Sequence, residues 1–122
     1  MEWPQATTLL FERARALDLL RRDDQAEAAY LTVLERAPQH FRSLNDLGLL
    51  YHRKGLPTKA ALCFELAVEA DPNSATAEAN LAYMLFALGN LDGARSHFDR
   101  ALEIDPHHPA ANAGRTQVRQ RT

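Results

Sequence analysis

The sequence predicts an all-α repeat protein, on three observations. Prolines recur every 34 residues, at 38, 72 and 106. Between them apolar residues recur at the spacing of an α-helix, and each apolar stretch ends near a glycine or a proline. A fixed period of this size is typical of solenoids, in which each unit buries its apolar face against the next. We therefore predict a single domain, 1–122, that is a solenoid of antiparallel helix pairs.

Other residue types keep the same register over three predicted units, 7–40, 41–74 and 75–108. The recurring positions are Ala26, Ala60 and Ala94, then Tyr30, Phe64 and Phe98, then Val33, Ala67 and Ala101. Alanine allows two helices to approach closely, and an aromatic ring can fill the space between one hairpin and the next. We expect these positions to form the core, because a helical stripe of this kind is usually packing.

The middle unit, 41–74, contains two predicted helices. An apolar stripe over 44–51 stops before Gly55, which can adopt the left-handed conformation that ends a helix. Pro57 suits the first turn of a second helix, because its missing N–H would have no partner there. The second stripe ends before Pro72, since the residue before a proline is pushed out of the helical region. Each unit is thus predicted to be a helical hairpin.

The first unit departs from this pattern at its turn. Arg21 occupies the place that Gly55 and Gly89 hold in the other two units. A left-handed conformation carries a steric cost for any residue with a Cβ. We therefore predict that 7–40 is the least stable unit.

Residues 109–122 predict one further helix that does not continue the repeat. Pro109 suits its first turn, whereas Arg115 stands where a fourth unit needs a leucine. A polar helix is what a solenoid needs to cover its last face, so we expect a cap. The alternative is that the chain is a piece of a longer array or multidomain protein.

Composition excludes several classes of function. The net charge of −2 argues against a general binder of the phosphate backbone of nucleic acids. One cysteine, Cys63, cannot form an internal disulfide. The N-terminus lacks the basic and apolar regions of a secretory signal, and no apolar run has the roughly 18 residues of a membrane span. A cytoplasmic protein without membrane contact is the expectation.

The periodic residues resemble the tetratricopeptide repeat, a 34-residue helix–turn–helix unit. The middle unit matches its pattern throughout, with Leu44, Leu47, Gly48, Tyr51, Gly55, Ala60, Phe64, Ala67 and Pro72. The third unit matches with Leu81, Ala82, Leu85, Gly89, Ala94, Phe98, Ala101 and Pro106. The first is degenerate, with Leu10, Ala14, Leu17, Ala26, Tyr30, Val33 and Pro38 but no turn glycine. The resemblance implies a right-handed superhelix whose first helices line a concave groove.

By the same resemblance, particular places of each unit face that groove. The residues expected to bind a ligand in the groove are Phe11, Arg15, Arg42, Asn45, Leu49, His52, Arg53, Tyr83 and Phe86. Further groove-facing places hold Thr8, Asp18, Leu19, Thr76, Ala79 and Ala87. The arginines could bind carboxylates of a ligand, or pair internally with Asp18 or Asp46. Tyr83 and Phe86 predict an apolar contact surface, unless a C-terminal element folds over them.

Family members that hold the carboxylate of chaperone tails do so with a clamp of lysine, asparagine and arginine. The matching positions here hold Phe11, Arg15, Asp46, Thr76 and Asn80, which depart from that clamp. We therefore expect no capture of chaperone tails.

No set of residues converges on catalysis or a metal. Cys63 and His97 hold the same place in successive units, so stacking should separate them by roughly 8–10 Å, too far for a nucleophile pair. His107 and His108 are adjacent in a loop, which gives too few converging zinc ligands, and His108 could cap the next helix. We expect no enzymatic activity, no cofactor and no metal.

These observations favour a protein-interaction module that binds a peptide or protein segment of unknown identity in its groove. One alternative is a self-associating assembly scaffold, a homo-oligomer in which exposed stacking faces pair end to end. The other is the N-terminal repeat domain of a larger protein. Nucleic acid and membrane are not expected partners.

Overall fold

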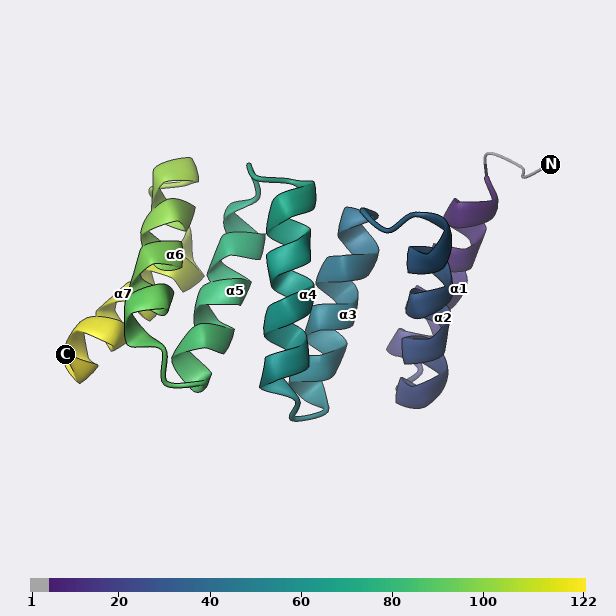
Figure 1. Ribbon diagram of the computed structural model, residues 1–122, viewed down its shortest axis with the longest axis horizontal. Coiled ribbons are helices and arrows are strands. Elements are labelled where there is room, and N and C mark those ends of the chain that lie inside the picture. Colours follow the sequence, from purple (N-terminus) through teal and green to yellow (C-terminus); the bar gives the residue numbers. More distant parts are fainter. Residues whose placement is uncertain (1–4) are drawn as a thin grey trace.

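The computed structural model describes residues 5–122, and every regular element in that range is a helix. The helices are α1 (Ala6–Leu19), α2 (Asp23–Arg36), α3 (Phe41–Arg53), α4 (Pro57–Ala70), α5 (Ala75–Ala87), α6 (Leu91–Ile104) and α7 (Pro109–Arg121). They follow one another in a row from one end of the molecule to the other (Figure 1). The predicted all-α solenoid is confirmed, and the seven helices fit three hairpins and a capping helix.

Neighbouring helices make nearly all the contacts between elements. The pairs α1 with α2, α3 with α4 and α5 with α6 form the three hairpins, which meet through α2 with α3 and α4 with α5. The last helix, α7, packs on both α6 and α5. Each hairpin therefore depends on its neighbour to cover its apolar face, as expected of a repeat array.

The turn inside each hairpin uses a left-handed residue. Gly55 has a φ of +77° and Gly89 a φ of +85°, and Arg21 adopts the same region with a φ of +59°. In all three turns the next backbone N–H closes a bond to the helix, as from Arg22 to the Leu17 carbonyl at 3.0 Å. The prediction that Arg21 must supply the glycine conformation is confirmed.

A side chain caps the N-terminus of each of the helices α3, α5 and α7, and the three capping residues hold equivalent positions in the repeat. The side chains of His40, Ser74 and His108 accept hydrogen bonds from the backbone N–H three residues later. For His40 and His108 the acceptor is the ring Nδ1, at 3.2 Å in each case. These bonds satisfy N–H groups that the first turn of a helix leaves unpaired, and the expected cap at His108 is confirmed.

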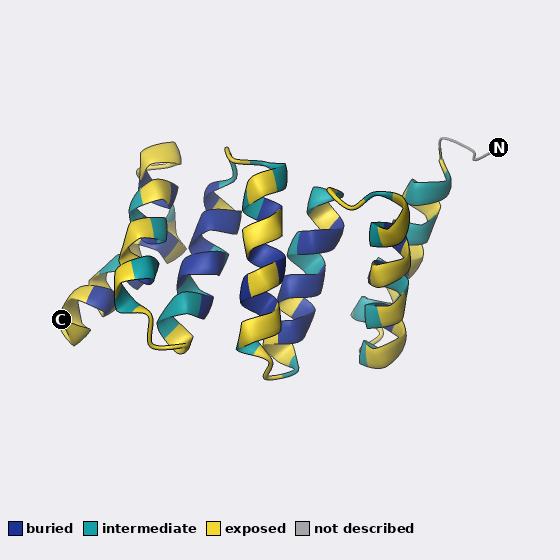
Figure 2. Cartoon of the chain, viewed as in Figure 1, coloured by how far each residue is buried: buried dark blue, intermediate teal, exposed yellow. Residues whose placement is uncertain are grey.

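The predicted core positions are buried. Tyr30, Phe64 and Phe98 are at most 1% exposed, and the alanines at 26, 60 and 94 are fully buried. A Cβ added at Gly48 would lie 2.6 Å from the Phe64 ring, so the small residue there does permit close approach. Burial is greatest in the middle of the row, on α3 to α5, whereas α1 buries only Phe11 and Ala14 (Figure 2).

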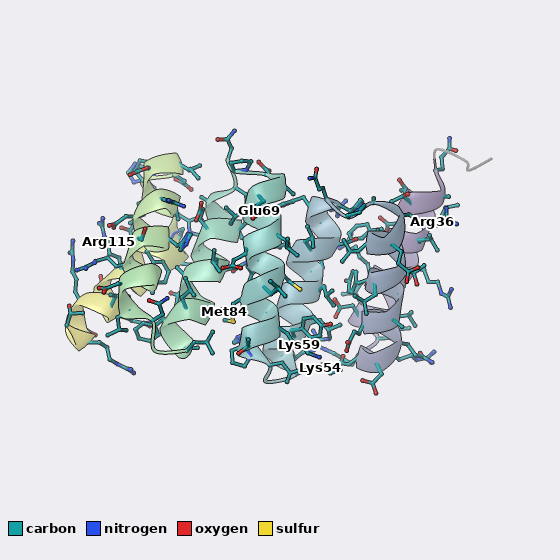
Figure 3. All side chains as sticks on the ribbon, viewed as in Figure 1. Arg36, Lys54, Lys59, Glu69, Met84 and Arg115 are labelled. Atoms are coloured by element: carbon teal, nitrogen blue, oxygen red, sulfur yellow. The ribbon has the colours of Figure 1, made fainter. Side chains whose placement is uncertain are left out.

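The helix α7 closes the C-terminal end with small residues. It buries Ala111, Gly114 and Val118 against α5 and α6, and a Cβ at Gly114 would clash with the Phe98 ring. Arg115, labelled in Figure 3, is half-buried, and its guanidinium lies 3.7 Å from the Asp99 carboxylate. Because Gly114 has no side chain, α7 can lie close over the third hairpin.

Candidate ligand-binding groove

The residues predicted to face a groove lie on α1, α3 and α5. Eight of those that are exposed or half-buried are called the groove face: Arg15, Arg42, Asn45, Leu49, His52, Arg53, Tyr83 and Phe86. Phe11 and Ala79 are different, because their side chains are only 2% and 1% exposed. The expectation that these two residues are open to a ligand is therefore wrong. Phe11 is buried because α3 and the loop before it cover its ring.

Phe11 forms a platform beneath charged side chains. Its ring centroid lies 6.3 Å from that of Tyr30 and 5.0 Å from that of His40. The guanidinium of Arg42 lies 4.8 Å from the ring centroid, and that of Arg15 lies 5.9 Å from it. An arginine over an aromatic face is attracted by the ring quadrupole and keeps its N–H donors free for other partners. Phe11 thus positions two groove-face cations from below.

A cavity of about 270 Å³ opens between α1 and α3. Its walls are Arg15, Asp18, Leu19, Arg21, Tyr30, Asp46, Leu49 and Arg53. We call it the α1–α3 cavity. It combines two carboxylates and three guanidinium groups with two leucine side chains, so it can contact both charged and apolar parts of one ligand.

One of these cations is already paired within the protein. The Arg53 guanidinium lies 2.8 Å from the Asp18 carboxylate and 2.7 Å from that of Asp23. The hydroxyl of Tyr30 also donates to Asp18, at 2.8 Å. The hydrogen bonds to Asp23 and Asp18 raise the pKa of Arg53, and the bond from Arg53 lowers the pKa of Asp23. Of the two roles considered for Arg53, the structure favours internal pairing.

Asp46 is the carboxylate that remains without such a partner. It is half-buried on α3, and no described side chain forms a hydrogen bond or ion pair with it. Burial raises the pKa of Asp46, although the charges of Arg15 and Arg42 act in the opposite direction. The sequence suggested Asp46 only as a partner for an arginine. Its departure from asparagine at a clamp position was the one available signal that it could matter.

Tyr83 and Phe86 contact the C-terminal helix. The Tyr83 ring meets Phe98 edge to face at 4.9 Å, and its hydroxyl donates to the Ala110 carbonyl at 2.9 Å. The Arg121 guanidinium lies 4.9 Å from the Phe86 ring centroid. Both aromatic side chains are half-buried, so α7 covers part of the surface they offer. The C-terminal helix therefore covers both residues in part, which is the alternative that the sequence left open.

The cysteine and histidine residues considered as catalytic or metal-binding candidates are buried or contact other parts of the protein. Burial raises the pKa of Cys63 to about 11, and His97 places its Nδ1 2.7 Å from the Glu78 carboxylate. His108 caps α7 and contacts the Thr76 hydroxyl at 3.2 Å. Among residues 5–122 no group of three or more histidine, cysteine, aspartate or glutamate side chains could hold a metal ion. In the same range no helix has the length and apolarity to cross a membrane.

Comparison with known proteins decides the family. The sequence profile of the tetratricopeptide repeat matches residues 11–75 and 59–109, which together are most of the chain. The chain belongs to the tetratricopeptide repeat family. It is 28% identical over 108 residues to human tetratricopeptide repeat protein 7B, covering 88% of this chain and 13% of that protein.

Two further matches place this repeat domain in context. It is 33% identical over 83 residues to a probable UDP-N-acetylglucosamine–peptide N-acetylglucosaminyltransferase SPINDLY of Hordeum vulgare, covering 68% of this chain and 9% of that protein. The chain thus spans a small part of the curated relatives it matches. The first tetratricopeptide repeat domain of Spaghetti (RPAP3), bound to the HSP90 peptide SRMEEVD, superposes with a TM-score of 0.89. That match has 21% identity and covers 96% of this chain and 93% of the other.

The positions that form the carboxylate clamp in some tetratricopeptide repeat proteins are used differently here. Phe11 is buried, and Asp46 has a carboxylate at a place where the clamp has an asparagine. The Asn80 amide donates to the Asn45 side chain at 3.2 Å, which joins α5 to α3. Phe11 and Asn80 therefore contact other parts of the protein, and Asp46 replaces an amide by a carboxylate.

Proposed function

We propose that this protein is a non-catalytic interaction module that binds a peptide or protein segment across the groove face. The observation that carries the proposal is the α1–α3 cavity, which is lined in part by Leu49. The Leu49 side chain is 42% exposed. An apolar side chain next to unpaired charges is the combination that anchors a ligand and orients it. The peptide held by the RPAP3 domain supports the same use of this fold.

The groove face offers an extended segment contacts from three helices, α1, α3 and α5. Arg15 and Arg42 lie at its N-terminal end, Leu49 and His52 in the middle, and the uncovered parts of Tyr83 and Phe86 towards α7. Burial of one leucine by a partner contributes roughly 1.5–3 kcal/mol before ordering costs. A few such anchors are enough for a specific interaction.

The test is selection of binders from a library of random peptides about 12 residues long, since an extended chain spans about 3.3 Å per residue. Selected peptides should bind Leu49→Gln at least about tenfold more weakly, which is about 1.4 kcal/mol. Leu62→Gln is the matched control, because Leu62 is 57% exposed on α4, away from the groove face. Peptides that bind Leu49→Gln as well as the wild type would remove the proposal.

A second candidate function is self-association through the N-terminal face. Leu10 and Leu17 occupy places that a preceding hairpin covers in the other units. They line a depression of about 410 Å³, and Leu9 and Leu20 beside them are 69% and 63% exposed. Light scattering over a range of concentrations tests it, and a monomer at every concentration would exclude an assembly scaffold.

A further inference from the structure

Arg15 and Arg42 are the two arginines of the groove face that the protein leaves without a counter-ion, and they are called the arginine pair. Neither side chain forms an ion pair or a hydrogen bond with another side chain between residues 5 and 122. Arg53, in contrast, is held by Asp18 at 2.8 Å and by Asp23 at 2.7 Å. The structure thus divides the groove-face arginines into one that stabilises the protein and two that remain available to a ligand.

The Phe11 ring holds the arginine pair in place. Its centroid lies 5.9 Å from the guanidinium of Arg15 and 4.8 Å from that of Arg42. Attraction to the ring positions both charges without using their N–H donors. Arg15 comes from α1 and Arg42 from α3, so a segment that crosses these two helices meets both.

Positive charge predominates around the arginine pair. Asp46 is the carboxylate that acts on it, and burial raises the pKa of Asp46, so this group compensates the two guanidinium charges only in part. Asp46 is half-buried in the wall of the α1–α3 cavity, whereas Arg42 is exposed outside that wall. Burial and the charge of Arg42 lower the pKa of His40, as expected of a base near a positive charge. Charge complementarity therefore favours an anionic group that approaches from the solvent side.

We propose that the arginine pair binds the carboxylate of a glutamate or aspartate side chain in a segment on the groove face, while an apolar side chain of that segment packs on Leu49. The inference rests on the proposed function, since the acidic residue belongs to the bound segment. A guanidinium group can give a carboxylate two parallel hydrogen bonds, and Arg15 lines the α1–α3 cavity together with Leu49. No free C-terminus is needed, because the carboxylate belongs to a side chain.

The experiment selects random peptides of about 12 residues that are displayed through their C-terminus, so that side chains supply every carboxylate. The targets are the wild type, Arg15→Gln/Arg42→Gln and the control Arg13→Gln/Arg100→Gln. Arg13 on α1 and Arg100 on α6 are exposed and lie outside the groove face, so the control loses the same net charge. Wild type and control should select peptides with glutamate or aspartate at one fixed position, and Arg15→Gln/Arg42→Gln should not.

A synthetic copy of a selected peptide, amidated at its C-terminus, measures the contact itself. Replacement of its acidic residue by glutamine or asparagine should weaken binding to the wild type at least about tenfold, which is about 1.4 kcal/mol. The same replacement should leave binding to Arg15→Gln/Arg42→Gln unchanged, because the contact is already lost in that variant. Should the double variant fail to fold, Arg42→Gln gives the comparison, since Arg42 is exposed.

Three results would overturn the inference, and only the last of them also removes the proposed function. Peptides that depend on Leu49 but have no fixed acidic position would leave the groove face as a binding site and exclude the role of the arginine pair. An acidic position that persists in peptides selected on Arg15→Gln/Arg42→Gln would assign the carboxylate contact to other residues. A library with no peptide that depends on Leu49 would remove both this inference and the proposed function.

Discussion

The first and second hairpins are held together differently from the second and third. Between the first and second hairpins, charged side chains cross from α3 to α2: Arg53 reaches Asp23 at 2.7 Å, and Lys54 reaches Asp24 at 3.0 Å and Glu27 at 2.9 Å. Lys54 lies at the lower end of α3 in Figure 3. Between the second and third hairpins, no ion pair joins the side chains that the structure describes, and one neutral hydrogen bond runs from the Asn80 amide to Asn45 at 3.2 Å. The contact between these two hairpins is otherwise formed by buried apolar residues such as Phe64, Leu81 and Met84.

Single substitutions at equivalent places produce this difference. Arg53 and Lys54, which form the ion pairs at the first junction, correspond to the uncharged Ala87 and Leu88 at the second. Tyr51 donates to Glu27 at 3.0 Å, whereas the equivalent residue of the third unit is Leu85. Exposed ion pairs contribute at most about 1 kcal/mol each, and a buried leucine or phenylalanine roughly 1.5–3 kcal/mol. The period fixes where hairpins stack, and the residues at each place set how strongly.

The largest effect is expected at the apolar junction. Phe64→Ala should lower the free energy of unfolding by about 3–5 kcal/mol, because it leaves a cavity where two hairpins meet. Denaturant unfolding followed by circular dichroism measures it. Leu66→Ala on the same helix is the control, since Leu66 is 41% exposed. Should Phe64→Ala fail to fold, Phe64→Leu gives a smaller loss that still has to exceed that of Leu66→Ala.

A smaller effect of opposite sign is expected in the first hairpin. Arg21→Gly should raise the free energy of unfolding by about 1–2 kcal/mol, because glycine adopts the φ of +59° without a steric cost. Gly55→Ala should lower it, since no atom lies within 4 Å of the added Cβ and the backbone conformation alone is strained. A loss of stability in Arg21→Gly would show that the arginine side chain contributes more than its strain costs.

The caps of α3 and α5 differ in their response to pH. Burial and the charge of Arg42 lower the pKa of His40 below its usual 6.5, so the unfolded chain binds the proton more tightly than the folded one. Protonation also removes the Nδ1 acceptor of the cap. The contribution of His40 is therefore complete above pH 6.5 and is lost as the pH falls through the lowered pKa.

Replacement by the residue that caps α5 isolates this effect. His40→Ser should keep the cap at every pH, so the wild type should lose about 1 kcal/mol relative to the variant on acidification. Unfolding curves at about pH 7.5 and about pH 5 measure the difference in the free energy of unfolding between the two proteins. An unchanged difference would mean that the cap at His40 does not depend on its neutral ring.

The smallest effect is expected at the ion pairs. Arg53→Met keeps most of the apolar stem and removes the bonds to Asp18 and Asp23. Its loss of stability should be lower than that of the other variants and should shrink at about 1 M salt, where charges are screened within about 3 Å. Thermal unfolding at low and high salt measures it. A loss that is the same at both salt concentrations would assign the role of Arg53 to packing.

The sequence predicted those features that all units share. The hairpins, the left-handed turn at Arg21 and the buried places follow from a repeated pattern, and each unit reinforces the others. Contacts specific to one pair of units could not be predicted in this way. The sequence left open whether Arg53 pairs with Asp18, 35 residues away, or binds a ligand, and it gave no signal that His40, the cap of α3, covers Phe11.

The most direct test of this account is native-state hydrogen exchange, resolved by helix. Because ion pairs supplement the apolar contact of the first hairpin with the second, and because α1 buries few residues, the amides of this hairpin should open together and earlier than the rest. We expect the amides of α1 and α2 to exchange at a lower free energy of opening than those of α3 to α5. Equal protection across the helices from α1 to α5 would contradict the claim that the polar junction is the weaker one.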